Sequence, residues 1–194
     1  MSLEIPLFPL NTVLFPGGPL PLRVFEPRYL DMVSDCLKHD TGIGIVLIQD
    51  GSEVGEVTST YDVGTMGHIG YWNKRRDGLL GVTIVGDQRF RILGREIRPS
   101  RLMVAEVELI ANEPEVPLPE EFEPLADLLD QILQQLDPPY TTMTTHFDDS
   151  TWVSARLCEL LPMQLVQKQN LLGLNDPLER LTRLYDMLHE LDVA

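Results

Sequence analysis

The sequence predicts an α+β protein in which a strongly bent sheet or small β-barrel with one early helix precedes an α-helical bundle. Short β-branched runs broken by glycines and turn dipeptides occupy residues 1–111, whereas every apolar pattern in 123–194 has helical spacing. A Pro/Glu-rich stretch, residues 112–122, lies between the two compositions and is expected to be a stiff, solvated linker. We therefore expect a barrel subdomain at 1–111 and a helical bundle subdomain at 123–194.

The N-terminal stretch, residues 5–37, combines many apolar residues with six prolines. Proline lacks a backbone donor and resists helix formation, so the residues before Pro27 are expected to form short extended segments that turn at Gly17 and Gly18. Pro27 at a first helical position is followed by apolar residues at helical spacing, which predicts one amphipathic helix. A stretch this apolar must be covered by later parts of the chain, and we expect it to begin the core.

Further strands are expected between residues 43 and 110. Residues 43–48 form an apolar, β-branched run typical of a strand buried on both faces. Glycines recur in residues 61–72, where they indicate bulges, sharp bends or the close approach of another backbone. The other expected features are strands at 53–57, 79–85, 88–93 and 102–110, a hairpin at Asp77-Gly78 and a turn at Gly86-Asp87.

The C-terminal part is expected to be helical throughout. Leucine and isoleucine residues at helical spacing predict a first helix within residues 125–136. Asp149 or Ser150 is expected to cap the second helix. Pro162 separates that helix from a short third one, and Pro177 opens the last.

The net charge of −15 and its distribution disfavour several function classes. Nucleic acids and anionic membrane surfaces bind through cations, and the chain has 15 Lys and Arg against 30 Asp and Glu. Residues 1–111 carry 11 basic and 14 acidic side chains, whereas 112–194 carry 4 and 16. No basic leader and no long apolar run is present, so we expect a cytoplasmic protein without a membrane partner. Cys36 and Cys158 are expected to be buried thiols.

Several short motifs follow one another in a recognisable order. They are Leu14-Phe15-Pro16-Gly17, Phe25-Glu26-Pro27-Arg28-Tyr29, Gly44-Ile45-Val46-Leu47-Ile48, Val63-Gly64-Thr65, Gly86-Asp87-Gln88-Arg89-Phe90 and, in the helical part, Leu161-Pro162 and Lys168-Gln169. Together they resemble the Lon N-terminal (substrate-binding) domain family over nearly the whole chain. The resemblance implies a bent PUA-like β-barrel followed by a helical bundle, with a role in binding unfolded or tagged protein substrates.

The motifs of the other domains of the full-length protease are missing from this sequence. No G-x-x-x-x-G-K-[ST] phosphate loop occurs, and Lys38, Lys74 and Lys168 have no context like the family's Ser–Lys proteolytic dyad. The resemblance therefore implies a free-standing, ATP-independent member without ATPase or protease domains. We expect it to bind unfolded or specific polypeptides, with no cofactor, no metal and no catalytic residue of its own.

Two aromatic groups are candidates for peptide contact. Tyr71 and Trp72 precede the cations Lys74, Arg75 and Arg76 at the expected hairpin, where they could also stack a nucleotide base or form a plain exposed hairpin. The second group either lines a groove for apolar peptide or belongs to the core, and consists of Phe8, Phe15, Phe25 and Tyr29.

Arg23, Glu26 and Arg28 are candidates for an anion clamp, because the guanidinium fork suits carboxylates. The alternative is an internal Glu–Arg pair that ties the second strand to the first helix. Two further functions stay open at this point. One is an enzyme or sensor with a small-molecule site at the barrel–bundle junction. The other is an RNA-binding PUA-like protein with a basic stripe that includes Arg89 and Arg91.

Two histidines have partners of catalytic or metal-binding type nearby in sequence. His68 with Asp62 and Ser59 or Thr60 contains the residue types of a hydrolytic triad, but a surface histidine on a strand is the favoured interpretation. His146 with Asp148 and Asp149 has the chemistry of a metal site, and a capping loop before a helix is the alternative.

Overall fold

The structure is a computed structural model that describes residues 2–54 and 57–192 of the 194-residue chain. It contains two compact units, Met1–Asn112 and Glu113–Ala194. The first is built of strands around one early helix and the second of helices, which confirms the predicted α+β class and the order of its parts. Each unit is described by itself below.

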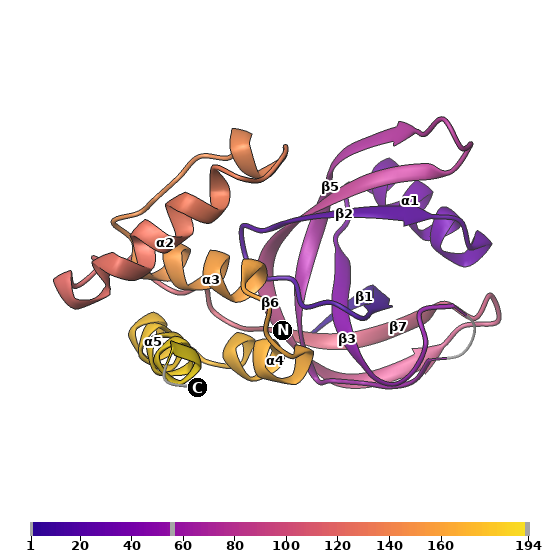
Figure 1. Cartoon of the computed structure of the whole chain (residues 1–194). Coiled ribbons are helices and arrows are strands. Elements are labelled where there is room, and N and C mark those ends of the chain that lie inside the picture. Colours follow the sequence, from indigo (N-terminus) through magenta and orange to yellow (C-terminus); the bar gives the residue numbers. More distant parts are fainter. Residues whose placement is uncertain (1, 55–56, 193–194) are drawn as a thin grey trace. The chain divides into compact units, whose positions relative to one another are not determined.

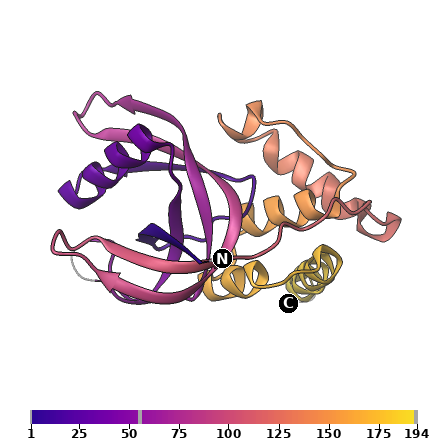
Figure 2. The same cartoon turned by 180° about the vertical axis from the view of Figure 1, so that it is seen from behind.

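Five strands of the first unit close into a ring, as Figures 1 and 2 show. They are β1 (Leu3–Leu10), β7 (Met103–Leu109), β6 (Leu80–Ile97), β5 (Val63–Lys74) and β3 (Ile43–Gly51), in the order in which they neighbour one another. Parallel pairing of β1 with β3 closes the ring, with Leu7 opposite Gly44. β2 (Pro19–Val24) pairs with β6, and β4 (Val57–Thr60) pairs with β3. The helix α1 (Pro27–His39) follows β2.

Two apolar clusters fill the first unit, and β1 and β3 contribute to both. Ile5 and Leu7 of β1 belong to one cluster, whereas Phe8 and Leu10 belong to the other. This division follows the alternation of side chains along a strand. Residues 43–48 are buried throughout, as predicted for a strand covered on both faces. The buried face of α1 joins the second cluster through Tyr29, Met32, Val33 and Cys36.

The glycines of β5 allow the strand to bend and to pass close to its neighbours. A Cβ atom on Gly64 would lie 2.4 Å from the carbonyl oxygen of Ile45, and one on Gly67 would lie 2.4 Å from the Ile84 side chain. The register with β6 also shifts twice, between Thr65 and Gly67 and between Ile69 and Tyr71. The predicted bulges and close approaches are therefore confirmed.

The turn predicted at Gly86-Asp87 is wrong, because β6 continues through it from Leu80 to Ile97. Gly86 instead lies against the chain before β2. Its N–H donates to the Gly18 carbonyl and its own carbonyl accepts from the Gly17 N–H, both at 2.8 Å. A Cβ atom here would lie 2.4 Å from the Phe15 carbonyl oxygen. Gly86 thus allows the backbone of β6 to pack closely against the chain before β2, and β6 continues through this position.

The hairpin predicted at Asp77-Gly78 is confirmed, since it joins β5 to β6 and Gly78 has a φ of +83°. Such a positive φ is readily adopted by glycine. The strand predicted at 53–57 includes residues 55 and 56, which lie outside the described residues. In the described part, β4 begins at Val57.

The second unit contains four α-helices and two short 3-10 helices. They are η1 (Glu120–Phe122), α2 (Glu123–Leu133), η2 (Tyr140–Thr142), α3 (Ser150–Leu160), α4 (Leu165–Leu172) and α5 (Pro177–Asp192). The segment expected to be a solvated linker is held against the start of α3. The Val116 N–H donates to the Asp149 carboxylate at 3.0 Å, and the Ser150 N–H donates to the Val116 carbonyl at 2.7 Å.

Candidate functional site

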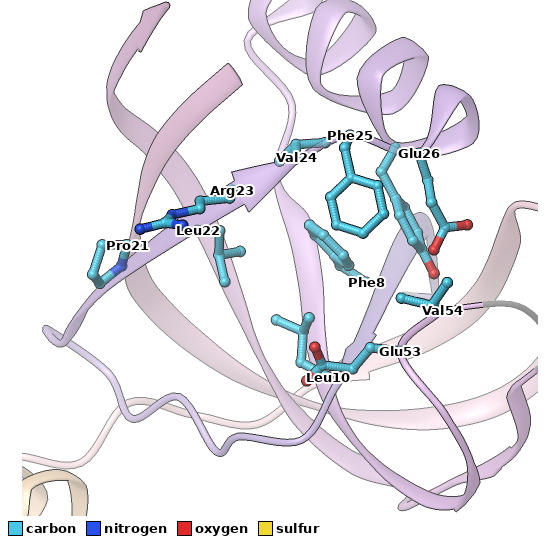
Figure 3. Close-up of a pocket in the computed structure, with 11 residues that line it drawn as sticks. Phe8, Leu10, Pro21, Leu22, Arg23, Val24, Phe25, Glu26, Glu53 and Val54 are labelled. Atoms are coloured by element: carbon cyan, nitrogen blue, oxygen red, sulfur yellow. The ribbon is translucent and has the colours of Figure 1, made fainter. Parts of the chain in front are cut away.

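A groove opens in the first unit between β2, the start of α1 and the chain that follows β3 (Figure 3). Its cavity volume is about 180 Å³. A cavity of roughly 150 Å³ holds a benzene-sized group, so this groove has room for one aromatic or large aliphatic side chain. Its lining combines apolar side chains with charged ones, namely Phe8, Leu10, Pro21, Leu22, Arg23, Val24, Phe25, Glu26, Tyr29, Glu53 and Val54.

Two stacked rings form the fixed part of the groove. The rings of Phe8 and Tyr29 stack with centroids 4.2 Å apart, and both side chains are buried. The Arg28 guanidinium lies 4.6 Å from the centroid of the Tyr29 ring, a cation–π distance. Phe25 is 52% exposed and its ring points toward Phe8 in Figure 3. The groove therefore presents a partly exposed ring beside a rigid aromatic wall.

The local sequence explains why Phe25 and Tyr29 take these positions. Pro27 starts α1, and the Glu26 carbonyl accepts from the Tyr29 and Leu30 N–H groups, each at 3.0 Å. This first turn directs Tyr29 to the buried face of α1. Phe25 lies in the short connection before the helix, outside the ladder of β2, and stays at the surface.

Charged groups rim the groove. The Glu26 carboxylate pairs with the Arg28 guanidinium at 2.9 Å, and the Glu53 carboxylate accepts from the Asn11 N–H at 2.5 Å. Burial raises the pKa of Tyr29; Arg28 opposes the shift, and Glu26 and Glu53 add to it. The groove therefore combines an aromatic wall with an ion pair and the Glu53 carboxylate beside it.

The structure brings together some of the predicted site residues and separates others. Phe25 and Tyr29 lie in the groove with Arg23 and Glu26, and Arg28 pairs with Glu26 beside it. Phe15 is only 1% exposed and is not among the residues that line the groove. The other candidates, Tyr71 and Trp72, are exposed on β5 and do not line the groove.

Sequence reasoning missed six lining residues, namely Leu10, Pro21, Leu22, Val24, Glu53 and Val54. Glu53 and Val54 follow β3 and approach the groove only because β3 pairs with β1. No local pattern marks them, since their role depends on the closing of the ring.

Comparisons with known proteins identify the family. Residues 4–190 match the family described as the ATP-dependent protease La (LON) substrate-binding domain. The chain belongs to the Lon substrate-binding domain family. A crystal structure of a Lon N-terminal domain protein from Xanthomonas campestris is 35% identical, covers 95% of this chain and 98% of its own, and superposes with a TM-score of 0.79.

Other relatives are more distant. The N-terminal domain of Mycobacterium avium complex Lon protease is 17% identical over 94% of this chain and 96% of its own, with a TM-score of 0.63, and shares the fold. Lon protease 2 of Herpetosiphon aurantiacus is 28% identical over 99% of this chain and 24% of its own length. Lon protease of Escherichia coli K12 is 26% identical over 98% and 25%. The chain thus spans about a quarter of these curated relatives.

Asp62 and Thr60, which lie close to His68 in sequence, contact another residue in the structure. The Arg95 guanidinium donates to the Asp62 carboxylate at 2.6 Å and to the Thr60 hydroxyl at 3.1 Å. His68 is exposed on β5. The group is therefore an arginine-centred contact between β6, the end of β4 and the connection from β4 to β5, which the sequence interpretation did not include.

The residues around His146 cap a helix. The Asp149 carboxylate accepts from the N–H groups of Thr151 and Trp152 at the start of α3, which confirms its predicted capping role. The His146 ring meets the Trp152 ring edge to face, with centroids 6.0 Å apart. Among the residues that the structure describes, no three His, Cys, Asp or Glu side chains gather as a metal site requires.

Both thiols are buried, as predicted. Burial raises the pKa of Cys158 to about 12, against the opposing effect of Arg180, and burial also raises the pKa of Cys36. A nucleophilic cysteine acts as a thiolate, so these environments oppose that role. None of the helices in residues 2–54 and 57–192 is both long and apolar enough to cross a bilayer.

Proposed function

We propose that this chain binds polypeptides non-catalytically, without ATP, and that the groove takes an apolar side chain of the bound segment. The observation that carries the proposal is Phe25, a half-exposed ring held beside the stacked Phe8 and Tyr29. Phe25 and Val54, 52% and 61% exposed, line the same groove, and neighbouring exposed apolar side chains mark interaction sites in a way that a single one does not. Membership of a family described as a substrate-binding domain supports the same conclusion.

The size of the groove favours a polypeptide over a small-molecule ligand. Pockets for drug-sized ligands measure roughly 300–1,000 Å³, whereas this one measures about 180 Å³. One side chain fits, with the rest of the segment continuing over the rim. Binding of this kind uses one apolar anchor surrounded by weaker contacts.

The test is fluorescence polarisation with a labelled dodecapeptide of Gly and Ser that carries one central Phe, Leu or Glu. We expect Phe and Leu peptides to bind and the Glu peptide to bind weakly. Phe25→Ala is expected to reduce affinity roughly tenfold, because it removes an anchor contact. Phe25 is exposed, so the variant should keep the wild-type melting temperature.

The matched control is Ile97→Ala, which truncates a 62% exposed apolar side chain on β6 outside the groove. It is expected to bind as the wild type does. Equal affinities of Phe25→Ala, Ile97→Ala and wild type would show that the groove is not the binding site.

A further inference from the structure

The second half of β5 has an open edge. β3 pairs with β5 only at residues 65–67, whereas β6 pairs with β5 as far as Lys74. Within the described part of the chain, residues 70–74 therefore have a strand neighbour on one side only. We call residues 70–74 the β5 edge. Figures 1 and 2 show the β5–β6 hairpin extending beyond the ring.

The backbone of the β5 edge is directed away from β6 at alternate residues. The Arg75 N–H donates to the Leu79 carbonyl at 2.9 Å. Bonded and non-bonded residues alternate in an antiparallel pair, so Asn73 is bonded to β6 while the N–H and C=O groups of Trp72 and Lys74 point away from it. These are the groups that an added strand would use.

The side chains of this hairpin combine aromatic rings with cations. Tyr71 and Trp72 are 61% and 57% exposed. Alternation places Trp72 with Lys74 on one face and Tyr71 with Arg75 on the other. Arg75 pairs with Asp77 at 3.5 Å, whereas Lys74 and Arg76 have no ion pair or hydrogen bond among the described residues. Each face therefore offers one ring and one cation.

Natural sheets usually protect their open edges with proline, bulges or charges. β2, which also has one strand neighbour in the described structure, carries Pro19 and Pro21. The β5 edge has no proline and places aromatic rings at the exposed positions. The edge does carry Lys74 and the register shift between Ile69 and Tyr71, both of which discourage indiscriminate pairing. Its exposed rings beside a cation instead offer contacts to a partner of complementary charge.

We propose that the β5 edge binds an extended, acidic polypeptide segment as an added strand. Main-chain hydrogen bonds to Trp72 and Lys74 supply affinity, and the rings contact the side chains of the segment. The cations select Asp and Glu through charge complementarity. This inference rests on the proposed function, because the ligand is again a polypeptide. It assigns the binding to the β5 edge and not to the groove, and it requires an acidic segment and not an apolar side chain.

Acidic polypeptide suits this surface better than single-stranded nucleic acid. Nucleic acid would stack on the same rings. Its sugar–phosphate backbone, however, has no alternating N–H and C=O groups and cannot continue the strand pairing that Trp72 and Lys74 offer.

The probe is a fluorescein-labelled octapeptide of alternating Val and Glu, measured by fluorescence polarisation. Two versions carry backbone N-methyl groups, either on the Val or on the Glu residues. An added strand bonds through every second residue. One methylated version is therefore expected to lose binding and the other to keep it. Equal binding by both versions would overturn strand addition.

Variants locate the surface. Trp72→Ala and Lys74→Glu are each expected to weaken binding about tenfold. Lys38→Glu makes the same charge change at an exposed lysine on α1 and is expected to have no such effect. Equal losses for Lys38→Glu and Lys74→Glu, or tighter binding of an oligo-uridine than of the peptide, would refute the proposal. Ile97→Ala, which lies outside the groove and the β5 edge, should leave this affinity unchanged. Lys74→Glu should bind the Phe dodecapeptide as the wild type does, which separates this outcome from that of the groove.

Discussion

Arg180 is the side chain that joins most parts of the helical unit. It is 2% exposed and donates to the Glu113 carboxylate, to the Ser154 hydroxyl at 3.1 Å and to the carbonyls of Leu171 and Leu174. One guanidinium on α5 thus bonds the first residue of the unit, α3 and the end of α4. A buried charge is tolerated only with such complete pairing.

Removing one partner of this pair should destabilise the helical unit strongly. We expect Arg180→Met to lower the free energy of unfolding by about 3–5 kcal/mol, because Glu113 would remain buried without its cation. Urea titration followed by circular dichroism measures the change. Arg183→Met is the control, since its pair with Glu179 is about half exposed and contributes roughly 0–1 kcal/mol. Similar midpoints for the two variants would contradict the expectation.

Burial of Cys158 predicts a loss of stability in alkali. The folded thiol has a pKa of about 12, whereas an unfolded chain releases this proton near pH 8.5. Above pH 9 the folded state therefore holds one more proton, and the free energy of unfolding falls by about 1.4 kcal/mol per pH unit. Tyr140, with a pKa raised by burial to about 12, acts in the same direction above pH 10.

The measurement is the urea midpoint between pH 8 and 10.5 for the wild type and Cys158→Ala. We expect the urea midpoint of Cys158→Ala to fall less steeply with rising pH than that of the wild type, whatever the stability of the variant at pH 8. Parallel slopes would show that the thiol does not contribute.

Sequence reasoning at this scale succeeded for local interactions and failed for distant ones. The cap at Asp149 was predictable because the carboxylate bonds N–H groups two and three residues away. The Arg180–Glu113 pair joins residues 67 positions apart. Glu113 looked like one of many solvated glutamates in a proline-rich stretch, so nothing local marked it as buried.

Among the elements, the strands and α1 were predicted well because their apolar patterns match their burial. Residues 43–48 and the face of α1 are examples, and both are buried as expected. Gly86 was misinterpreted because a glycine–aspartate pair is typical of turns, whereas here the absence of a Cβ atom serves close packing against Phe15. A turn and a close backbone approach require the same residue type, and only the tertiary structure distinguishes them.

Two glycines in strands test this distinction. Gly64→Ala should destabilise the barrel unit by about 1–3 kcal/mol, because the added methyl group would overlap the Ile45 carbonyl and the Phe90 ring. Gly94→Ala on β6 should be close to neutral, since no atom lies within 4 Å of its Cβ position. The melting temperatures of both variants test this expectation. Equal decreases would mean that the close approach of the Ile45 carbonyl does not explain the glycine at position 64.

For the whole molecule, the motif pattern was sufficient to predict the class and the family. It could not predict the groove, which combines Phe8 from β1, Phe25 from the β2–α1 connection and Val54 from the chain after β3. These three segments meet only after the ring closes. The sequence also could not show which aromatic candidates of the second group belong to the core. Three of the four are buried, namely Phe8, Phe15 and Tyr29.

We predict that residues 1–112 fold without the helical unit. All strands of the ring and both apolar clusters belong to this range. A fragment of residues 1–112 is expected to show a cooperative thermal transition and dispersed amide resonances in an NMR spectrum. Resonances typical of a random coil would contradict this domain boundary.

The position of β1 in the ring has a consequence for synthesis on the ribosome. β1 is made first, yet it pairs with β7, in which Val107 lies opposite Leu3. At 5–20 residues per second, roughly 100 residues of elongation take on the order of 5–20 s. During that time the apolar strand β1 cannot pair with β7. Nascent or truncated chains that end before Met103 should therefore depend on chaperones far more than the finished protein does.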